Sequence, residues 1–269
     1  MRIGIIGCGW LGLPLATALI ERGHHVIGTS TTATKLPQLQ RAGIEAFLLD
    51  LNTALPDSLL RALYTCNRLF VSIPPGRGYS DVIARYPDWM RKLLAVDNGT
   101  ARWVFTGSTG VYGRAEGRVD EQTPPRPERT SPRAVLAAEQ ILRATLGDRL
   151  TVLRLAGLAG GGREPGRWLA GKKDIPGGDA PVNLVHRDDV SALSIATLEA
   201  AGPLDGCYNV CADLHPPKAA YYRARALHLG LEPPVFQLGG GNGKRIVGER
   251  IKAVFAYRMK WPDPSSFPV

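Results

Sequence analysis

The chain has 269 residues, of which 44% are hydrophobic and 21% charged, and its formal net charge is +9 at pH 7. This composition is typical of a folded globular protein and excludes disordered and fibrous chains. The positive charge is spread along the sequence without a block of five like charges. It therefore argues against a nucleic-acid-binding tail and favours a cleft for a small phosphate-bearing molecule.

Short apolar runs alternate with helical patterns over the first 156 residues. The expected strands cover residues 2–6, 25–28, 46–49, 69–73, 102–106 and 151–155. The expected helices cover residues 13–22, 36–42, 58–64, 80–96 and 135–146. Strands that are apolar throughout and separated by helices indicate a parallel sheet covered on both faces. The predicted fold class is therefore α/β, a doubly wound parallel sheet of the Rossmann type.

The alternation breaks after residue 157, where the sequence becomes rich in glycine and proline. Further strands are expected at residues 182–185 and 207–210, and further helices at 188–200, 216–227 and 245–254. We expect a Rossmann domain over residues 1–156. Residues 157–269 would mainly form a small C-terminal substrate cap, with 182–200 returning to the Rossmann domain.

The uncharged run at residues 3–20 contains four glycines and Pro14. These residues suit a strand and a phosphate-binding turn better than a signal or membrane helix. The four cysteines do not form a disulfide framework in a chain of this length, and no His or Cys partner at zinc spacing accompanies Cys207 and Cys211. We expect no metal site and a reducing, cytoplasmic setting.

The strongest motif is Gly7-Cys8-Gly9-Trp10-Leu11-Gly12, a G-x-G-x-x-G between the first strand and the first helix. Gly7 permits the tight turn, Gly9 lets a pyrophosphate approach the backbone, and Gly12 lets helix and strand pack closely. The helix amides and dipole then bind the phosphates. All three glycines, with Trp10 and Leu11, are predicted cofactor-binding residues.

The type of cofactor follows from the end of the second strand. An NAD site usually has an acidic residue there, but no acid lies between Glu21 and Glu45. Small hydroxyls and a cation suit a 2′-phosphate, which favours NADP while NAD stays open; alternatively, the hydroxyls only cap the next helix. The predicted contacts are Thr29, Ser30, Thr31 and Lys35, together with Asp50 after the third strand.

Later segments resemble the extended short-chain dehydrogenases/reductases, the NAD-dependent epimerase/dehydratase group. The motif at residues 105–113, Phe-Thr-Gly-Ser-Thr-Gly-Val-Tyr-Gly, resembles that family's fifth strand and its turn. Residues 153–163, 182–190, 208–210 and 243–245 continue the similarity in chain order. The resemblance implies a Ser or Thr after this strand, which Ser108 matches, and a Tyr-x-x-x-Lys on the next helix.

The Tyr-x-x-x-Lys pair is absent from this chain. The alignment places Ser131 and Val135 at its two positions, and no lysine occurs between Lys92 and Lys172. Ser108 and Tyr112 are the predicted catalytic residues, with Tyr112 as proton donor. The alternative for Tyr112 is a packing aromatic with a satisfied hydroxyl. For His186 the two interpretations are an acid–base group and a lock on a strand-to-helix turn.

Two functions follow from these features. The first is an NAD(P)-dependent oxidoreductase or epimerase/dehydratase-like enzyme acting on a small polar substrate. The second is a non-catalytic dinucleotide-binding sensor or regulatory protein. The expected partners are a small-molecule substrate and, as an option, a second copy of the chain in a homodimer. No nucleic acid and no membrane are expected, because no base-reading motif or spanning segment accompanies the charge.

Overall fold

The computed structural model describes residues 1–76, 81–204, 206–237, 239 and 241–268. Two compact units make up the chain. The first contains residues 1–111, 128–153 and 191–207, and the second contains 112–127, 154–190 and 208–269. Each unit thus combines several stretches of sequence. The predicted domain boundaries at residues 156 and 182–200 stay a prediction.

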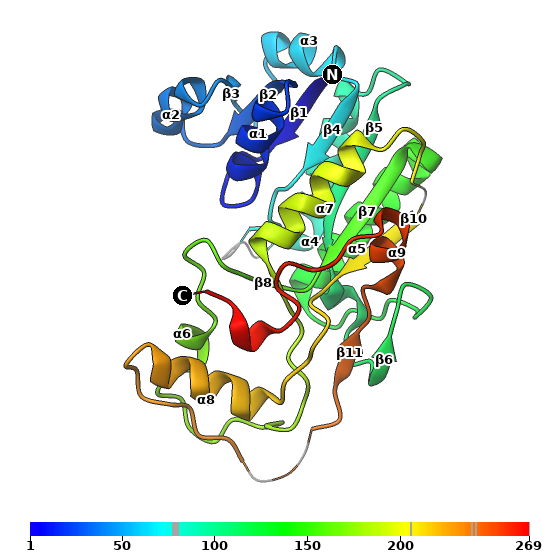
Figure 1. Ribbon diagram of the computed structural model, residues 1–269. Coiled ribbons are helices and arrows are strands. Elements are labelled where there is room, and N and C mark those ends of the chain that lie inside the picture. The colour runs from blue at the N-terminus through cyan, green and yellow to red at the C-terminus, as the bar shows by residue number, and fades with distance from the viewer. Residues whose placement is uncertain (77–80, 205, 238, 240, 269) are drawn as a thin grey trace. The chain divides into compact units, whose positions relative to one another are not determined.

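The central feature is a seven-stranded sheet with the order β10-β7-β5-β4-β1-β2-β3 (Figure 1). Its strands are β1 (Arg2–Ile6), β2 (His25–Ser30), β3 (Glu45–Leu48), β4 (Arg68–Val71), β5 (Arg102–Ser108), β7 (Leu150–Leu155) and β10 (Gly206–Val210). The pairs β2–β3, β1–β2, β1–β4 and β4–β5 are all parallel. The predicted α/β, doubly wound class is confirmed.

Helices lie between consecutive strands of this sheet along the chain. They include α1 (Gly12–Glu21), α2 (Leu36–Arg41), α3 (Asp57–Tyr64), α4 (Val82–Leu93), α5 (Thr130–Leu146) and α7 (Arg187–Glu199). Helix α5 begins five residues before its predicted start because Pro132 lies in its first turn, where no amide partner is needed. The predicted helix over 80–96 begins at a residue outside the described ones.

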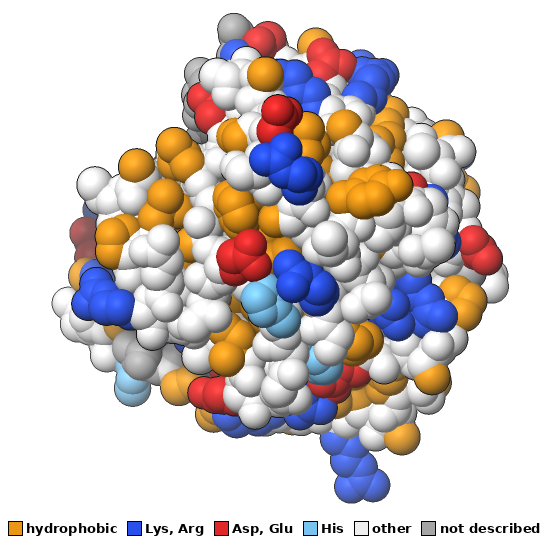
Figure 2. All heavy atoms as spheres, turned by 90° about the horizontal axis from the view of Figure 1, so that it is seen from above, with side chains coloured by type: hydrophobic (Ala, Val, Ile, Leu, Met, Phe, Trp, Pro, Cys, Tyr) orange, Lys and Arg blue, Asp and Glu red, His pale blue; other side chains and the backbone are white. Residues whose placement is uncertain are grey.

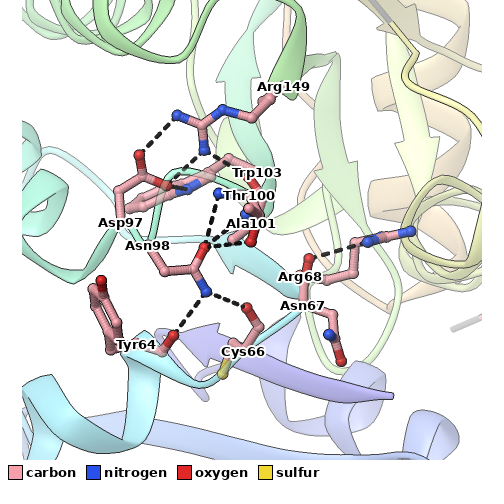
Figure 3. Close-up of polar contacts among 10 residues, drawn as sticks. All are labelled: Tyr64, Cys66, Asn67, Arg68, Asp97, Asn98, Thr100, Ala101, Trp103 and Arg149. Carbon is pink, nitrogen blue, oxygen red and sulfur yellow. Dashed lines mark hydrogen bonds and ion pairs between the residues drawn. The ribbon is translucent and has the colours of Figure 1, made fainter.

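Polar side chains fix the loops at the amino ends of β4 and β5 (Figure 3). The Asn98 amide donates to the carbonyls of Tyr64 and Cys66, at 2.7 and 3.1 Å. Its oxygen accepts from the backbone amides of Thr100 and Ala101, at 3.0 and 2.8 Å. The half-buried Asn98 side chain thus satisfies four backbone groups that the sheet leaves unpaired.

The neighbouring Asp97 carboxylate accepts two hydrogen bonds from the Arg149 guanidinium, both at 2.7 Å, and one from the Trp103 indole at 3.2 Å. Burial alone would raise the pKa of Asp97, but these hydrogen bonds lower it below its usual value. The bidentate pair therefore ties the loop before β5 to the turn before β7.

The second unit has two small parallel sheets and its own apolar cluster. Its elements are β6 (Gly117–Val119), β8 (Gly157–Ala159), α6 (Gly166–Leu169), β9 (Leu184–His186), α8 (Lys218–His228), β11 (Lys244–Ile246) and α9 (Glu249–Phe255). Strand β11 pairs with β6, and β8 pairs with β9. The buried cluster includes Tyr221, Tyr222, Phe236 and Phe267.

The predicted helix over residues 245–254 was wrong at its start. Residues 244–246 form β11, and the helix begins at Glu249. The cause is the Asn183 amide, which donates to the Lys244 carbonyl and accepts from the Ile246 amide, each at 2.8 Å. These bonds hold the segment extended, and this tertiary contact leaves no local signal in the sequence.

Charges on the surface are mixed. On the face shown in Figure 2, Lys and Arg side chains occur as separate groups with uncharged and acidic side chains between them. The described part of the chain contains no helix that is long and apolar enough to cross a membrane. The expected absence of nucleic-acid and membrane partners stays a prediction.

Candidate functional site

The turn between β1 and α1 is packed so closely that glycine is required at two of its positions. Gly7 has φ +104°, and a Cβ on it would lie 2.6 Å from the Ser72 carbonyl oxygen. A Cβ on Gly12 would lie 2.1 Å from the Gly7 carbonyl oxygen. The Gly7 amide donates to the Thr29 hydroxyl at 3.0 Å, which links the turn to β2. The sequence motif therefore folds into the tight strand–turn–helix that it predicted.

Gly9 is the exposed glycine of this turn. A Cβ on it would meet no atom within 4 Å, so the space above its backbone is open. The start of α1 at Leu11 has no side-chain cap, and the first turn of the helix has no acidic residue. The amides at a helix start and the positive end of the helix dipole attract anions. This end of α1 is suited to a phosphate.

A pocket of about 390 Å³ lies beside the turn. Its lining comes from the carboxyl end of β2, from the segments that follow β1, β2, β3 and β4, and from helix α4: Gly7, Thr29, Ser30, Thr31, Leu49, Asp50, Leu51, Asn52, Ile73, Pro74, Gly76 and Trp89. Strand β1 lies between β2 and β4, so this is the point where the strand order reverses. Ligands of open α/β sheets bind at the carboxyl ends of the strands at such a point.

Five of the predicted cofactor-binding residues line this pocket: Gly7, Thr29, Ser30, Thr31 and Asp50. The other five predicted residues, Gly9, Trp10, Leu11, Gly12 and Lys35, do not line it. Thr29 is buried and supports the Gly7 amide, whereas Thr31 is exposed.

Lys35 is exposed on a short 3₁₀ turn, Ala33–Lys35. The Ser30 hydroxyl accepts from the Thr32 amide at 3.1 Å, which makes a compact turn after β2. This contact lies before the 3₁₀ turn and does not cap it, because neither that turn nor α2 has a side-chain cap bond. Thr31 lies at the pocket wall.

Sequence reasoning missed the rest of the lining. Leu49, Leu51 and Asn52 follow β3, and Ile73 and Pro74 follow β4. Their positions at the carboxyl ends of predicted strands were a usable signal. Trp89 gave no such signal, because its place in the wall depends on how α4 packs.

Ser108 ends β5, and its side chain is partly buried. The Ser108 hydroxyl oxygen accepts from the Gly110 amide at 3.1 Å. A Cβ on Gly110 would lie 3.1 Å from the Pro132 side chain, so the turn after β5 fits closely against the start of α5. This bond uses the Ser108 oxygen as the acceptor. The hydroxyl hydrogen is not part of it and can be donated to a bound group.

Tyr112 belongs to the second unit, where it is 1% exposed. Its hydroxyl donates to the Asn209 amide oxygen at 2.9 Å and accepts from the Arg154 guanidinium at 3.0 Å. The Asn209 backbone amide in turn donates to the Glu121 carboxylate at 2.7 Å. A phenol has one hydrogen to donate, and here Asn209 receives it. This network favours the packing role, and proton donation by Tyr112 stays a prediction.

His186 lies in the second unit and is buried. Its Nδ1 accepts from the Asp188 backbone amide at 3.2 Å, at the turn between β9 and α7. Its ring lies 5.3 Å from the rings of both Trp261 and Phe267. Burial lowers the pKa of His186. These contacts favour the turn-locking interpretation of this histidine.

Asp189 anchors the C-terminal segment, a role that the sequence did not indicate. The carboxylate is 0% exposed and accepts from the Tyr257 hydroxyl at 2.7 Å. It also accepts from the backbone amides of Lys260 and Trp261, at 2.7 and 3.1 Å. Each oxygen of this buried carboxylate thus has at least one donor, which favours a structural role for Asp189.

Two observations bear on other chemistries. In the part of the chain that the structure describes, no group of three or more His, Cys, Asp or Glu side chains is arranged to hold a metal ion. Burial raises the pKa values of Cys8, Cys66 and Cys211 to about 12. These three thiols stay protonated near neutral pH and are poor nucleophiles.

Comparison with known proteins agrees with this geometry. Residues 2–103 match the model of the NAD-binding domain of 6-phosphogluconate dehydrogenase. The whole chain is 39% identical over 276 residues to protein YeeZ of Escherichia coli strain K12, covering 100% of this chain and 99% of YeeZ. The chain belongs to the YeeZ family.

Solved structures extend the comparison. A candidate NAD-dependent epimerase/dehydratase from Methylobacillus flagellatus is 27% identical, with a TM-score of 0.75, over 97% of this chain and 94% of that one. UDP-glucuronic acid 4-epimerase from Bacillus cereus, solved with NAD, is 16% identical with a TM-score of 0.77 over the same shares and shows the fold alone. The predicted resemblance to NAD-dependent epimerase/dehydratases is confirmed.

Proposed function

We propose that the chain binds a nicotinamide dinucleotide, with the pyrophosphate over Gly9 and the nucleoside in the adjoining pocket. The observation that supports this most strongly is the open backbone at Gly9 between two glycines, Gly7 and Gly12, that tolerate no side chain. The uncapped start of α1 adds donors for the phosphates. The solved epimerase with the same fold contains NAD. When bound, the nicotinamide supplies hydride chemistry.

We further propose a preference for NADP(H) over NAD(H). The segment from Thr29 to Lys35 contains no acid, Thr31 is exposed in the pocket wall, and Lys35 is exposed on the following turn. A 2′-phosphate that gains two charge-assisted hydrogen bonds would be favoured by about 3 kcal/mol, roughly a hundredfold. Asp50, the acid in this pocket, follows β3 and not β2.

Titration calorimetry with NADPH and NADH tests this preference. We expect the parent to bind NADPH more tightly, and Lys35→Ala to weaken NADPH binding about tenfold by removing one charged contact. Arg41→Ala, which removes an exposed cation from the last turn of α2, farther along the chain from Thr31 than Lys35, is the matched control and should change neither affinity. Tighter binding of NADH by the parent would overturn the preference for NADP.

The reaction that we propose is oxidoreduction, or epimerase/dehydratase-like chemistry, on a small polar substrate. Ser108 is the residue that matches the family's catalytic Ser or Thr, and its hydroxyl would orient a substrate oxygen by donating a hydrogen bond. The chain has no Tyr-x-x-x-Lys pair. If Tyr112 gives the proton instead, its hydroxyl must first leave Asn209, its present acceptor.

A panel of small carbonyl compounds with NADPH tests for turnover. Removing one positioned donor typically costs about 10²–10⁴ in rate. We therefore expect Ser108→Ala to lose activity on that scale while its NADPH affinity stays within about threefold of the parent. Ser58→Ala, an exposed serine on α3, serves as the control. Unchanged turnover by Ser108→Ala would remove this residue from the mechanism.

The alternative function is a non-catalytic dinucleotide-binding sensor or regulatory protein. The observation that favours it is the Tyr112 hydroxyl, which is satisfied within a buried network, in a chain without the Tyr-x-x-x-Lys pair. Tight NADPH binding without turnover of any compound in the panel would support this alternative. Turnover that Tyr112→Phe reduces about a hundredfold or more would instead support proton donation by Tyr112.

A further inference from the structure

Helix α4 holds the two loops that frame the nucleoside pocket. Tyr86, Trp89 and Lys92 are spaced three residues apart, so they lie along one side of this helix. The Tyr86 hydroxyl donates to the Ile73 carbonyl at 2.7 Å, after β4. The Lys92 ammonium donates to the Leu51 carbonyl at 2.7 Å, after β3. These two bonds therefore fix the backbone at Ile73 and at Leu51 before any ligand binds.

Between these two contacts, Trp89 begins a chain of hydrogen bonds that ends at Asp50. The Trp89 indole donates to the Asn52 side-chain oxygen at 3.3 Å. The Asn52 side-chain nitrogen donates to Asp50 Oδ1 at 2.9 Å. An indole N–H only donates and a carboxylate only accepts, so the two partners fix the orientation of the Asn52 amide.

The chain of bonds also fixes the Asp50 carboxylate. Its Oδ1 accepts a second bond from the Asn52 backbone amide, at 2.9 Å. Among the described residues, no hydrogen bond to Asp50 Oδ2 occurs. Asp50 is exposed and lines the pocket. Because a carboxylate oxygen can only accept, it favours a ligand edge that donates and repels one that presents another oxygen.

We propose that Asn52 and Trp89 are positioning residues for base specificity in this pocket. They hold Asp50 so that a dinucleotide whose purine carries an amino group is preferred over one that carries an oxo group at the same ring position. The indole of Trp89 also forms part of the pocket wall. This inference rests on the proposed dinucleotide site.

The experiment compares the adenine dinucleotide with its hypoxanthine analogue, in which oxo replaces amino. Calorimetry uses NADPH or NADH, whichever the parent binds more tightly, and the matching analogue. One hydrogen bond to a charged group predicts that the parent prefers the adenine form by about ten- to a hundredfold.

Two variants test the positioning role. Asn52→Ala removes the amide, and Trp89→Phe keeps an aromatic ring but removes the N–H donor. We expect each to reduce the preference to less than about threefold, mainly through weaker binding of the adenine form. Loss of general structure would weaken both forms equally and leave the preference intact. Asp88→Asn changes an exposed carboxylate of α4 outside the pocket and should behave as the parent.

The outcomes separate the two proposals. If the parent binds neither dinucleotide, the proposed function fails and the base specificity fails with it. If it binds both forms with equal affinity, the dinucleotide site stands and the base specificity is overturned. If the parent discriminates but Asn52→Ala and Trp89→Phe discriminate equally well, the positioning role is overturned.

Discussion

At the scale of single residues, the three glycines of the turn between β1 and α1 have different roles. Gly7 and Gly12 are required by the protein's own backbone, because a Cβ on either would lie within 2.6 Å of a carbonyl oxygen. Gly9 is not required by any contact of this kind. The fold therefore requires two of the three glycines, and Gly9 is the one over which we propose that the pyrophosphate lies.

This difference predicts that substitutions at Gly12 and Gly9 have unequal effects on stability. Gly12→Ala places a methyl group 2.1 Å from the Gly7 carbonyl oxygen and forces the turn to move. Overpacking of this kind typically costs about 1–3 kcal/mol. Gly9→Ala should lie within about 0.5 kcal/mol of the parent, as surface changes usually do. Denaturant unfolding of both variants checks this, and equal stability of the two would contradict the geometry.

At the scale of elements, the carboxyl end of α7 is tied to the sheet by cations. Arg68 donates to the carbonyls of Leu198 and Ala200, at 3.0 and 3.4 Å. Arg102 donates to the Ala200 carbonyl at 3.1 Å. The last carbonyls of a helix lack partners within it, and its dipole favours positive charge at this end. Arg68 and Arg102 supply both the hydrogen-bond donors for these carbonyls and the positive charge.

Glu199, the last residue of α7, makes this end sensitive to pH. Its carboxylate accepts from Arg22 at 2.7 and 2.6 Å and from His24 at 2.9 Å. Hydrogen bonds from Arg22, the largest cause, and from His24 lower the pKa of Glu199 from 4.5 to about 2. A depressed folded-state pKa means that this stabilisation is complete above pH 4.5 and is lost as pH falls toward 2.

We therefore expect Glu199→Gln to be less stable than the parent at pH 6, and the difference to shrink as pH is lowered from 4.5 to 3. Denaturant midpoints measured across this range provide the check. Glu21→Gln, at the exposed end of α1, is the control. A difference between parent and Glu199→Gln that is constant with pH would show that the carboxylate charge has no role.

The predicted strands and helices agree with the structure where a short stretch of sequence determines the element. The first five strands and the glycine turn follow from apolar runs, helix breaks and one motif within about 30 residues. Strands β6 and β11 were missed because each has three residues and pairs with a segment more than 120 residues away. Asn52 and Trp89 were missed for the same reason, since only the packing of α4 brings them together.

At the scale of the whole molecule, the proposed binding residues and Tyr112 belong to different units. The turn and the nucleoside pocket are built from residues of the first unit alone. The Tyr112–Asn209–Arg154 network belongs to the second unit. The proposed dinucleotide site thus lies within one unit. The reaction rests on Ser108 and on the family resemblance.

The most direct test of the central claim is titration calorimetry of the parent and of Gly9→Val with NADPH and NADH. The valine side chain would occupy the open space above the turn without meeting other protein atoms at its Cβ. We predict that the parent binds at least one of the two dinucleotides. We also predict that Gly9→Val, folded as judged by an unchanged unfolding midpoint, loses this binding by a hundredfold or more, about 2.7 kcal/mol. Binding by Gly9→Val as tight as that of the parent would contradict a dinucleotide site at this turn.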